Sequence, residues 1–300
     1  MMHLKHTKNE KHWRMKKMSE VDINQMIERA RQTISECDSV LITAGAGMGV
    51  DSGLPDFRGN EGFWQAYPVA KARGLSFEAM ANPEWFESDP TLAWAFYGHR
   101  LNLYRDTVPH EGFMMLRDLC KSKGDDYFIL TSNVDGQFQK AGFDKDKICE
   151  IHGSIHHLQC TKDKDHGIWS AYDENLTVDM KAFKALAPLP VCAKCGSMAR
   201  PNILMFGDWD WIGMRSDAQM KRFGRWKIDL MNEKKKVCVI EIGAGTAIAS
   251  IRRMSESTAK QFHTPLIRIN PRESKGFEGT IKLPMGGLEG IRQIIPDNCS

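Results

Sequence analysis

The stretch that decides the fold is LITAGAGMGVDSGLPDFRG, residues 41–59. Its apolar start predicts a buried β-strand over residues 39–43. Three glycines follow within five positions, at Gly45, Gly47 and Gly49. Glycines placed after a strand let the backbone approach a pyrophosphate and present N–H groups to it. The spacing departs from the G-x-G-x-x-G fingerprint, so the glycines alone fit either a nucleotide site or a tight turn.

The second half of the stretch adds chemically active side chains to this loop. Asp56, Phe57 and Arg58 lie between a proline and a glycine, which is typical of a hinged segment that closes over a ligand. The guanidinium of Arg58 could pair with a phosphate or carboxylate, and Phe57 could keep water from a reactive centre. The alternative is a surface turn with a salt bridge.

Further segments of the chain alternate between helical and strand patterns. Apolar residues recur at helical spacing over residues 21–37, and Asp89 before Pro90 is a helix start signal. Short apolar runs that end in polar or glycine residues predict buried parallel strands. These runs lie within residues 126–136, 147–154, 235–250 and 265–271, and another helix is expected over 110–122. The alternation predicts an α/β protein with an open, doubly wound parallel sheet.

We expect two domains with a cleft between them. The larger, Rossmann-like domain is predicted to comprise residues 20–60, 105–155 and 200–295. Residues 60–105 read as a helical insertion and residues 155–200 as a small polar cysteine module, which together form the second domain. Residues 1–20 read as a disordered basic tail. The active site is expected at the carboxyl ends of the strands.

Composition excludes several classes of protein. The 300 residues carry a formal net charge of only +3, which is too weak to argue for a specific nucleic-acid partner. No stretch approaches the length of a membrane span, and the start of the sequence lacks the apolar run of a secretion signal. Eight cysteines do not make a disulfide scaffold at this length, so a cytoplasmic protein is expected.

Motifs spread along the chain identify a resemblance. GAGMGVDSGLPDFRG is followed by TSNVDG (131–136), IHGS (151–154), CAKC (192–195), RPNILMFGD (200–208), GAGTAIAS (243–250) and RIN (268–270). In this order they resemble the signatures of the sirtuins, the NAD-dependent protein deacylases. The resemblance covers roughly residues 25–295, and the order makes it specific although each motif alone is not.

The resemblance implies a reaction and its catalytic residues. The oxygen of an acyl-lysine would attack the nicotinamide ribose of NAD, nicotinamide would leave, and deacylated lysine and O-acyl-ADP-ribose would result. His152 would be the general base, since histidine titrates near neutrality. Asn133 and Asp135 would complete the catalytic set, Asn133 bonding a ribose hydroxyl or positioning a water. An isolated histidine beside a glycine is more often a packed or surface residue, and an isolated Asn-x-Asp is more often an Asx turn.

The resemblance also implies binding residues. Ser132 stands where the family usually has a glutamine that contacts the ribose, so ribose positioning is expected to differ. Cofactor-binding residues would be Ala44, Gly45, Ala46, Gly47, Asp56, Phe57, Arg58, Ser132, Asn133, Asp135, Gly243, Gly245, Thr246 and Asn270. The peptide of an acylated protein would pair with an extended segment comprising Asn202, Ile203, Leu204, Met205, Phe206 and Gly207, whose alternative reading is a core strand.

The cysteine module is an incomplete zinc site by sequence. Cys192 and Cys195 form a close pair, whereas Cys160 has no cysteine partner and Asp163 or Lys164 occupies the expected position. Four ligands make a closed tetrahedral zinc site. The fourth ligand could be Asp163, Asp165, His157 or His166. The alternative is a module that has lost zinc and is held by packing.

Other functions remain to be weighed against deacylation. An NAD glycohydrolase or ADP-ribosyltransferase would use the same chemistry with another acceptor. A non-catalytic module would not need His152, and a flavin or nicotinamide oxidoreductase would not explain PDFR together with IHGS. Tyr97 and Arg100 have the spacing found in relatives that prefer acidic acyl groups, although a pair on a helix surface has the same spacing.

Overall fold

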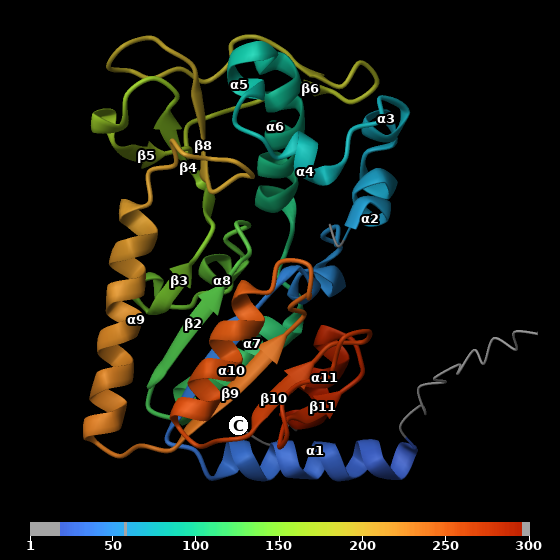
Figure 1. The fold of residues 1–300 in the computed structure, drawn as a ribbon, viewed down its shortest axis with the longest axis vertical. Helices are drawn as coiled ribbons and strands as arrows, with labels where there is room; N and C mark the ends of the chain where they lie inside the picture. Colours follow the sequence, from blue (N-terminus) through green and yellow to red (C-terminus); the bar gives the residue numbers. More distant parts are fainter. Residues whose placement is uncertain (1–18, 57–58, 296–300) are drawn as a thin grey trace, which may run out of the picture.

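A computed structural model describes residues 19–56 and 59–295 of the chain. Figure 1 shows two parts, a lower one built on a large sheet and an upper one of helices and short strands. The basic tail expected over residues 1–20 lies almost wholly outside the described residues, as do Phe57 and Arg58. Among the described residues, no helix combines the length and apolar character needed to cross a bilayer.

The large sheet has six parallel strands in the order β11-β10-β9-β1-β2-β3. Its topology is that of the doubly wound nucleotide-binding folds and confirms the predicted fold class. The strand order reverses where β1 pairs with both β2 and β9, so Val40 lies opposite Tyr127 and Cys238. Ligands of such sheets bind beyond the carboxyl ends at this reversal. The strands are β1 (Ser39–Ala44), β2 (Tyr127–Thr131), β3 (Ile148–Glu150), β9 (Val237–Ile242), β10 (Leu266–Ile269) and β11 (Ile281–Leu283).

Helices bury both faces of this sheet, which explains why its strands are mostly apolar rather than alternating. Helices α1 (Glu20–Ser35), α7 (Glu111–Ser122) and α11 (Gly287–Ile294) share one apolar core with the sheet. Helices α9 (Met214–Asn232) and α10 (Ser250–Gln261) share the core on the other face. The short α8 (Gln137–Lys140) follows β2.

The upper part has its own apolar core, dominated by aromatic side chains around α6 (Pro90–Asp106). This helix starts as predicted, because Asp89 accepts a hydrogen bond from the Leu92 amide and Pro90 occupies its first turn. Its other helices are α2 (Gly59–Ala66), α3 (Pro68–Ala72), α4 (Phe77–Met80) and α5 (Trp85–Ser88). Its strands are β4 (Gly153–Cys160), β5 (Ile168–Ser170), β6 (Val178–Asp179), β7 (Lys184–Ala185) and β8 (Ala199–Ile203).

Strands β5, β4 and β8 form a separate antiparallel sheet in the upper part. β8 therefore pairs with β4 and not with the large sheet, although the larger domain was expected to resume at residue 200. The exact domain boundaries stay a prediction. β4 starts directly after the predicted base and ends at the first predicted metal ligand, so one strand connects the two sites.

Candidate active site

The glycines after β1 and β9 allow two loops to touch. A Cβ on Gly45 would lie 2.7 Å from the Cα of Ala244, and one on Gly243 would lie 2.5 Å from the backbone of Gly47. Gly243 also has a left-handed backbone, with φ of +65°, which favours glycine. The stretch after Gly45 forms two 3₁₀ turns, Ala46–Met48 and Val50–Ser52. The glycines thus serve loop packing at the strand reversal.

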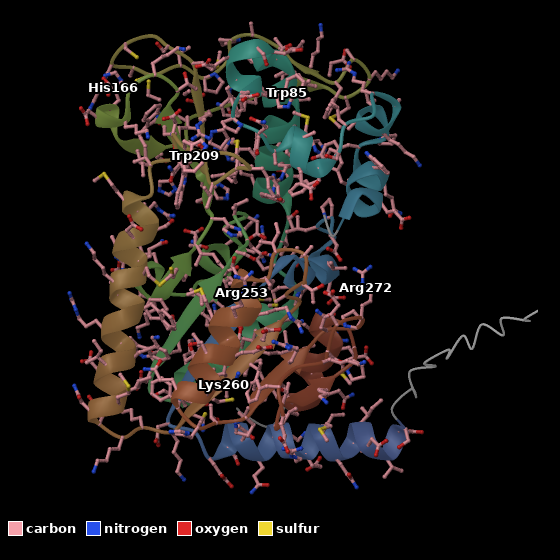
Figure 2. The ribbon with its side chains drawn as sticks, viewed as in Figure 1. Trp85, His166, Trp209, Arg253, Lys260 and Arg272 are labelled. Atoms are coloured by element: carbon pink, nitrogen blue, oxygen red, sulfur yellow. The ribbon has the colours of Figure 1, made fainter. Side chains whose placement is uncertain are left out.

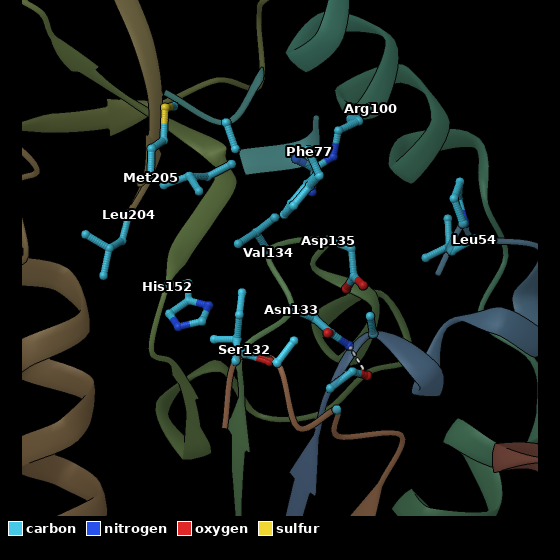
Figure 3. Close-up of a pocket in the computed structure, with 18 of the residues that line it drawn as sticks. Leu54, Phe77, Arg100, Ser132, Asn133, Val134, Asp135, His152, Leu204 and Met205 are labelled. Atoms are coloured by element: carbon cyan, nitrogen blue, oxygen red, sulfur yellow. Dashed lines mark hydrogen bonds between the residues drawn. The ribbon is translucent and has the colours of Figure 1, made fainter. Parts of the chain in front are cut away.

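A cavity of about 440 Å³ opens above these loops. Figure 3 shows Ser132 and Asn133 on its lower side, Arg100 and Phe77 on its upper side, and His152 at one flank. Most of the predicted catalytic and substrate residues meet here although they lie far apart in sequence. The predicted site residues that line the cavity are Gly45, Ala46, Ser132, Asn133, Asp135, His152, Ile203, Leu204, Met205, Phe206 and Gly245.

Other predicted site residues lie outside the lining. The Asn270 side chain is buried and holds two loops together: it donates to the Ala244 carbonyl and accepts from the amides of Arg272 and Glu273. The Thr246 amide and hydroxyl both donate to the Glu273 carboxylate. The remaining non-lining predictions among the described residues are Ala44, Gly47, Asp56, Asn202, Gly207 and Gly243.

Apolar residues of the cavity were missed from the sequence. Phe77 and Ala81 come from the helical insertion, and Ile248 and Ile251 from the region entering α10. None of them belongs to a polar motif, and their role depends on how the two parts of the molecule meet. Apolar patterning could have marked them as buried but not as cavity walls. The other missed lining residues are Leu54, Pro55, Glu78, Val134, Ala244 and Ala247.

His152 is held in a form suited to accept a proton. Burial lowers the pKa of its imidazole, and a hydrogen bond to the backbone of Ser132 opposes that effect. A ring N–H that donates to a carbonyl fixes the tautomer and leaves the other nitrogen as the acceptor. The carbonyl of His152 accepts from the Leu204 amide at 3.0 Å. The candidate base is therefore tied to the predicted substrate strand.

Asn133 and Asp135 occupy the loop after β2. The Asn133 side chain donates to the Gly45 carbonyl at 3.0 Å and so links this loop to the glycine loop. Asp135 is buried, and its carboxylate accepts from the Gln137 amide at 2.9 Å. Burial raises the pKa of Asp135 to about 6. Both side chains line the cavity and can accept or donate hydrogen bonds at its floor.

Arg100 and Tyr97 face the cavity from α6, so the alternative of a helix-surface pair is wrong. The Arg100 guanidinium donates to the Tyr104 hydroxyl at 2.9 and 3.0 Å. It also lies over the rings of Phe96, Tyr97 and Tyr104, with centroid distances of 5.0 to 5.6 Å. A buried cation surrounded by aromatic rings makes this end of the cavity suited to a ligand that carries negative charge.

The loop after β8 is fixed by a buried ion pair. Arg200 donates to both carboxylate oxygens of Asp208, at 2.7 and 2.8 Å, and both side chains are buried. The Met205 amide donates to the same carboxylate at 3.2 Å. The chain that leads out of β8 is therefore held in place beside the cavity.

A second cluster of functional groups lies in the cysteine module. The ligand atoms of Cys160, His166, Cys192 and Cys195 all lie within 4.8 Å of one another. The two sulfurs of Cys160 and Cys195 are 3.6 Å apart, and Cys192 Sγ is 3.3 Å from His166 Nδ1. Zinc–sulfur bonds of about 2.3 Å give tetrahedron edges of roughly 3.8 Å, so the four donors fit a tetrahedral zinc ion.

The cluster decides among the four residues that the sequence left open as the fourth ligand. His166 belongs to it, whereas Asp165 and His157 do not. Asp163 faces the other ring nitrogen of His166, Nε2, at 3.3 Å. A carboxylate in that position orients a metal-binding histidine and raises its basicity.

Comparison with known proteins identifies relatives of this chain. The model of the Sir2 family matches residues 45–221. An NAD-dependent protein deacylase of Thermococcus sibiricus is 32% identical over 217 residues, which cover 72% of this chain and 74% of the relative. NAD-dependent protein deacylase 1 of Archaeoglobus fulgidus is 28% identical over 252 residues, which cover 83% of this chain and 88% of the relative. A solved complex of a Sir2 homologue mutant with ADP-ribose is 25% identical, with a TM-score of 0.64 over 89% of this chain and 96% of the homologue.

Proposed function

This chain belongs to the Sir2 family, and from that premise we propose that it is an NAD-dependent protein deacylase. It removes acyl groups from lysine side chains of proteins and produces nicotinamide and O-acyl-ADP-ribose. The observation that carries the proposal is one cavity that joins His152, Asn133 and Asp135 to the glycine loops and to the strand-end residues 203–206. A non-catalytic module or a hydride-transferring enzyme would not require this combination.

Each polar residue of the cavity has a role in this proposal. NAD supplies a ribose from which nicotinamide can leave. His152 takes up a proton from a sugar hydroxyl, because burial keeps its imidazole neutral at physiological pH. Asn133 holds a ribose hydroxyl or a water beside the Gly45 carbonyl to which it is already bonded. Asp135 and Ser132 shape the floor on which the nicotinamide end of NAD rests. Ser132 is shorter than the glutamine that is usual in the family.

We assign the outer residues to cofactor and metal binding. Thr246, Gly243 and Gly245 form the loop for the phosphates and adenosine ribose, and Glu273, which already holds Thr246, adds a carboxylate there. Asn270 acts through this loop by fixing its neighbours. Asp56 forms an ion pair with Arg272 at 2.6 Å, which joins the cofactor loop to the end of β10. The cluster of Cys160, His166, Cys192 and Cys195 holds a structural zinc ion.

The compartment is proposed from the cysteines. None of the seven cysteines among the described residues forms a disulfide. Four of them lie outside the metal cluster and are buried: Cys37, Cys120, Cys149 and Cys238. Free buried thiols are typical of a reducing compartment, so we propose a cytoplasmic location. Fractionation of cells that produce the protein tests it.

Arg100 points to the kind of acyl group. A guanidinium in an apolar, aromatic wall attracts a carboxylate far more strongly than it would in water. We therefore propose that acyl chains ending in a carboxylate are better substrates than acetyl groups. Substituting Arg100→Gln should lower turnover of succinyl-lysine peptides more than turnover of acetyl-lysine peptides.

The deciding experiment is a mass-spectrometric assay of the purified protein with NAD. It is run without peptide, with an acetyl-lysine peptide and with the matched succinyl-lysine peptide. Nicotinamide release that depends on peptide, together with O-acyl-ADP-ribose, is the expected result. Equal NAD cleavage without peptide, giving free ADP-ribose, would instead assign the chain as an NAD glycohydrolase.

A further inference from the structure

Four large apolar side chains are exposed along the short segment that leaves β8. Trp209 is 90% exposed and Met214 is 71% exposed, and Leu204 and Phe206 are each exposed by more than a third. Figure 2 places Trp209 where the upper part of the molecule meets the top of α9. Large aromatic residues that are almost fully exposed are uncommon on protein surfaces, and contiguous apolar patches mark interaction sites.

Polar contacts fix the backbone on both sides of Trp209. Before it, Asp208 is buried in the bidentate ion pair with Arg200. After it, the Asp210 amide donates to the Asp208 carboxylate at 3.2 Å, and the Asp210 carbonyl accepts from the Gln159 side chain at 2.8 Å. Neither neighbour can move without breaking one of these polar contacts.

Further contacts fix the rest of the segment. The Trp209 carbonyl accepts from Lys164 at 2.9 Å, and the same ammonium pairs with the Asp210 carboxylate at 3.1 Å. The Ile212 amide donates to the Gln159 side chain, and the Ile212 carbonyl accepts from the buried Asn202 amide. The Trp209 indole is 90% exposed on a backbone that has little freedom. A pre-organised backbone loses little conformational entropy on binding.

The apolar surface continues into the cavity. Leu204, Met205 and Phe206 line it, and the Phe206 ring packs edge-on against Phe77 of the cavity wall with centroids 6.1 Å apart. Trp209 follows Phe206 by three residues. Three residues of chain span at most about 11 Å, so Trp209 lies within that distance of Phe206 at the cavity. An extended peptide rises about 3.3 Å per residue and therefore covers this distance within about four residues of its lysine.

We propose that Trp209 is a docking residue that selects acylated substrate proteins. It binds a large apolar side chain that lies within about four residues of the acyl-lysine, while the exposed faces of Phe206 and Met214 extend the contact. The proposal rests on the proposed deacylase function and adds a preference to it. Tryptophan is the residue type most often found to dominate the affinity of an interface.

The test compares peptides and variants by steady-state kinetics. Each acyl-lysine peptide carries one leucine or phenylalanine in an otherwise alanine and glycine background. The set of peptides places this residue in turn at each of the four positions before and after the lysine. For the favoured peptide, Trp209→Ala should raise KM roughly tenfold, as expected for truncation of a dominant interface residue, and leave kcat unchanged. Trp209→Phe should retain most of the preference. Free acyl-lysine, which cannot reach Trp209, should be turned over equally by all proteins.

Tyr172→Ala is the matched control, because Tyr172 is an aromatic residue that is 84% exposed in the cysteine module. The proposal is wrong if Trp209→Ala and Tyr172→Ala behave alike on every peptide. It is also wrong if Trp209→Ala leaves all KM values unchanged but dissociates an oligomer in sedimentation velocity, since the segment would then join copies of the chain. Failure of the wild-type protein to release nicotinamide with any acyl-lysine would overturn the deacylase function itself.

Discussion

At the scale of single residues, burial shifts the pKa values of two groups of the cavity in opposite directions, and both shifts favour the uncharged form. It lowers the pKa of His152 and raises that of Asp135 to about 6. The same physical cause acts on both, because an apolar surrounding penalises the charged form of either group. A neutral imidazole can accept a proton, and a carboxylate close to its pKa responds to small changes in its surroundings.

Replacing His152 by alanine should abolish turnover and leave NAD binding intact. The reason is that its imidazole is the only base assigned to the sugar hydroxyl, whereas both glycine loops remain. Mass-spectrometric turnover and calorimetric titration with NAD measure the two effects. In the wild-type protein, kcat/KM should fall as the pH drops below the lowered pKa of His152, since protonation removes the base.

His263→Asn is the matched control for this substitution. His263 is exposed at the opposite end of the sheet, before β10, and asparagine tolerates its φ of 51°. This variant should keep full turnover. Undiminished turnover by His152→Ala would show that another group acts as the base.

Asp135→Asn should change how stability depends on pH. The folded state raises the pKa of this carboxyl from 3.8 to about 6, so folding is penalised when the group is ionised. The difference corresponds to about 3 kcal/mol, present in full above pH 6 and absent below pH 4. Urea unfolding should therefore find the variant more stable than the wild type at pH 8, with the gap closing toward pH 4. If the difference in unfolding free energy between variant and wild type did not change with pH, Asp135 would not be a buried carboxyl with a raised pKa.

At the scale of elements, the junction of β3 and β4 sets the position of the base. Gly153 follows His152 with φ of +79°, and a Cβ there would overlap the Asn202 carbonyl oxygen of β8. Gly153→Ala should push the two strands apart and displace His152. A displacement of about 1 Å can cost a hundredfold in rate. Both kcat and the free energy of unfolding should fall.

Gly124→Ala separates this steric effect from backbone strain. Gly124 has a similar φ of +68°, but a Cβ there would meet no atom within 4 Å. The Gly124→Ala variant should lose only about 1–2 kcal/mol of unfolding free energy, the penalty for a left-handed backbone, and should keep the kcat of the wild type. If the two alanine variants were equally stable and equally active, the close approach of β4 and β8 would not constrain the site.

The elements also show how far sequence reasoning reaches. The parallel strands and the start of α6 were predictable because they depend on local signals, such as the apolar run before Gly45 and the Asp89–Pro90 cap. The two 3₁₀ turns after Gly45 were not, because they depend on the contact with Gly243, which is 198 residues away. The catalytic motif residues were found by resemblance. Phe77 and Ile251 were missed because only tertiary packing brings them to the cavity.

At the scale of the whole molecule, β4 connects the two sites. It begins at Gly153 beside the base and ends at Cys160 in the metal cluster. Its partner β8 begins shortly after Cys195 and leads into the segment that presents Trp209. Loss of the metal would therefore loosen the small sheet at one end and the substrate segment at the other. On this arrangement, a bound metal would stabilise the walls of the cavity from a distance.

The metal cluster gives the last prediction. The protein should bind one zinc ion per chain, and a chelator should lower its Tm. His166→Ala should lose the zinc because one of four donors is gone, whereas His166→Cys should keep it with four thiolates. Asp163→Asn removes the carboxylate on the far side of the imidazole and should weaken zinc binding by about ten- to a hundredfold.

Asp165→Asn is the control for that last effect, since Asp165 lies in the same turn but outside the cluster. Zinc content by inductively coupled plasma mass spectrometry and competition with a chromogenic chelator provide the measurements. If His166→Ala bound zinc as tightly as the wild type, the fourth donor would have to come from elsewhere. If Asp163→Asn and Asp165→Asn bound zinc equally tightly, the contact at 3.3 Å would not orient the histidine, and the imidazole would be held by the metal alone.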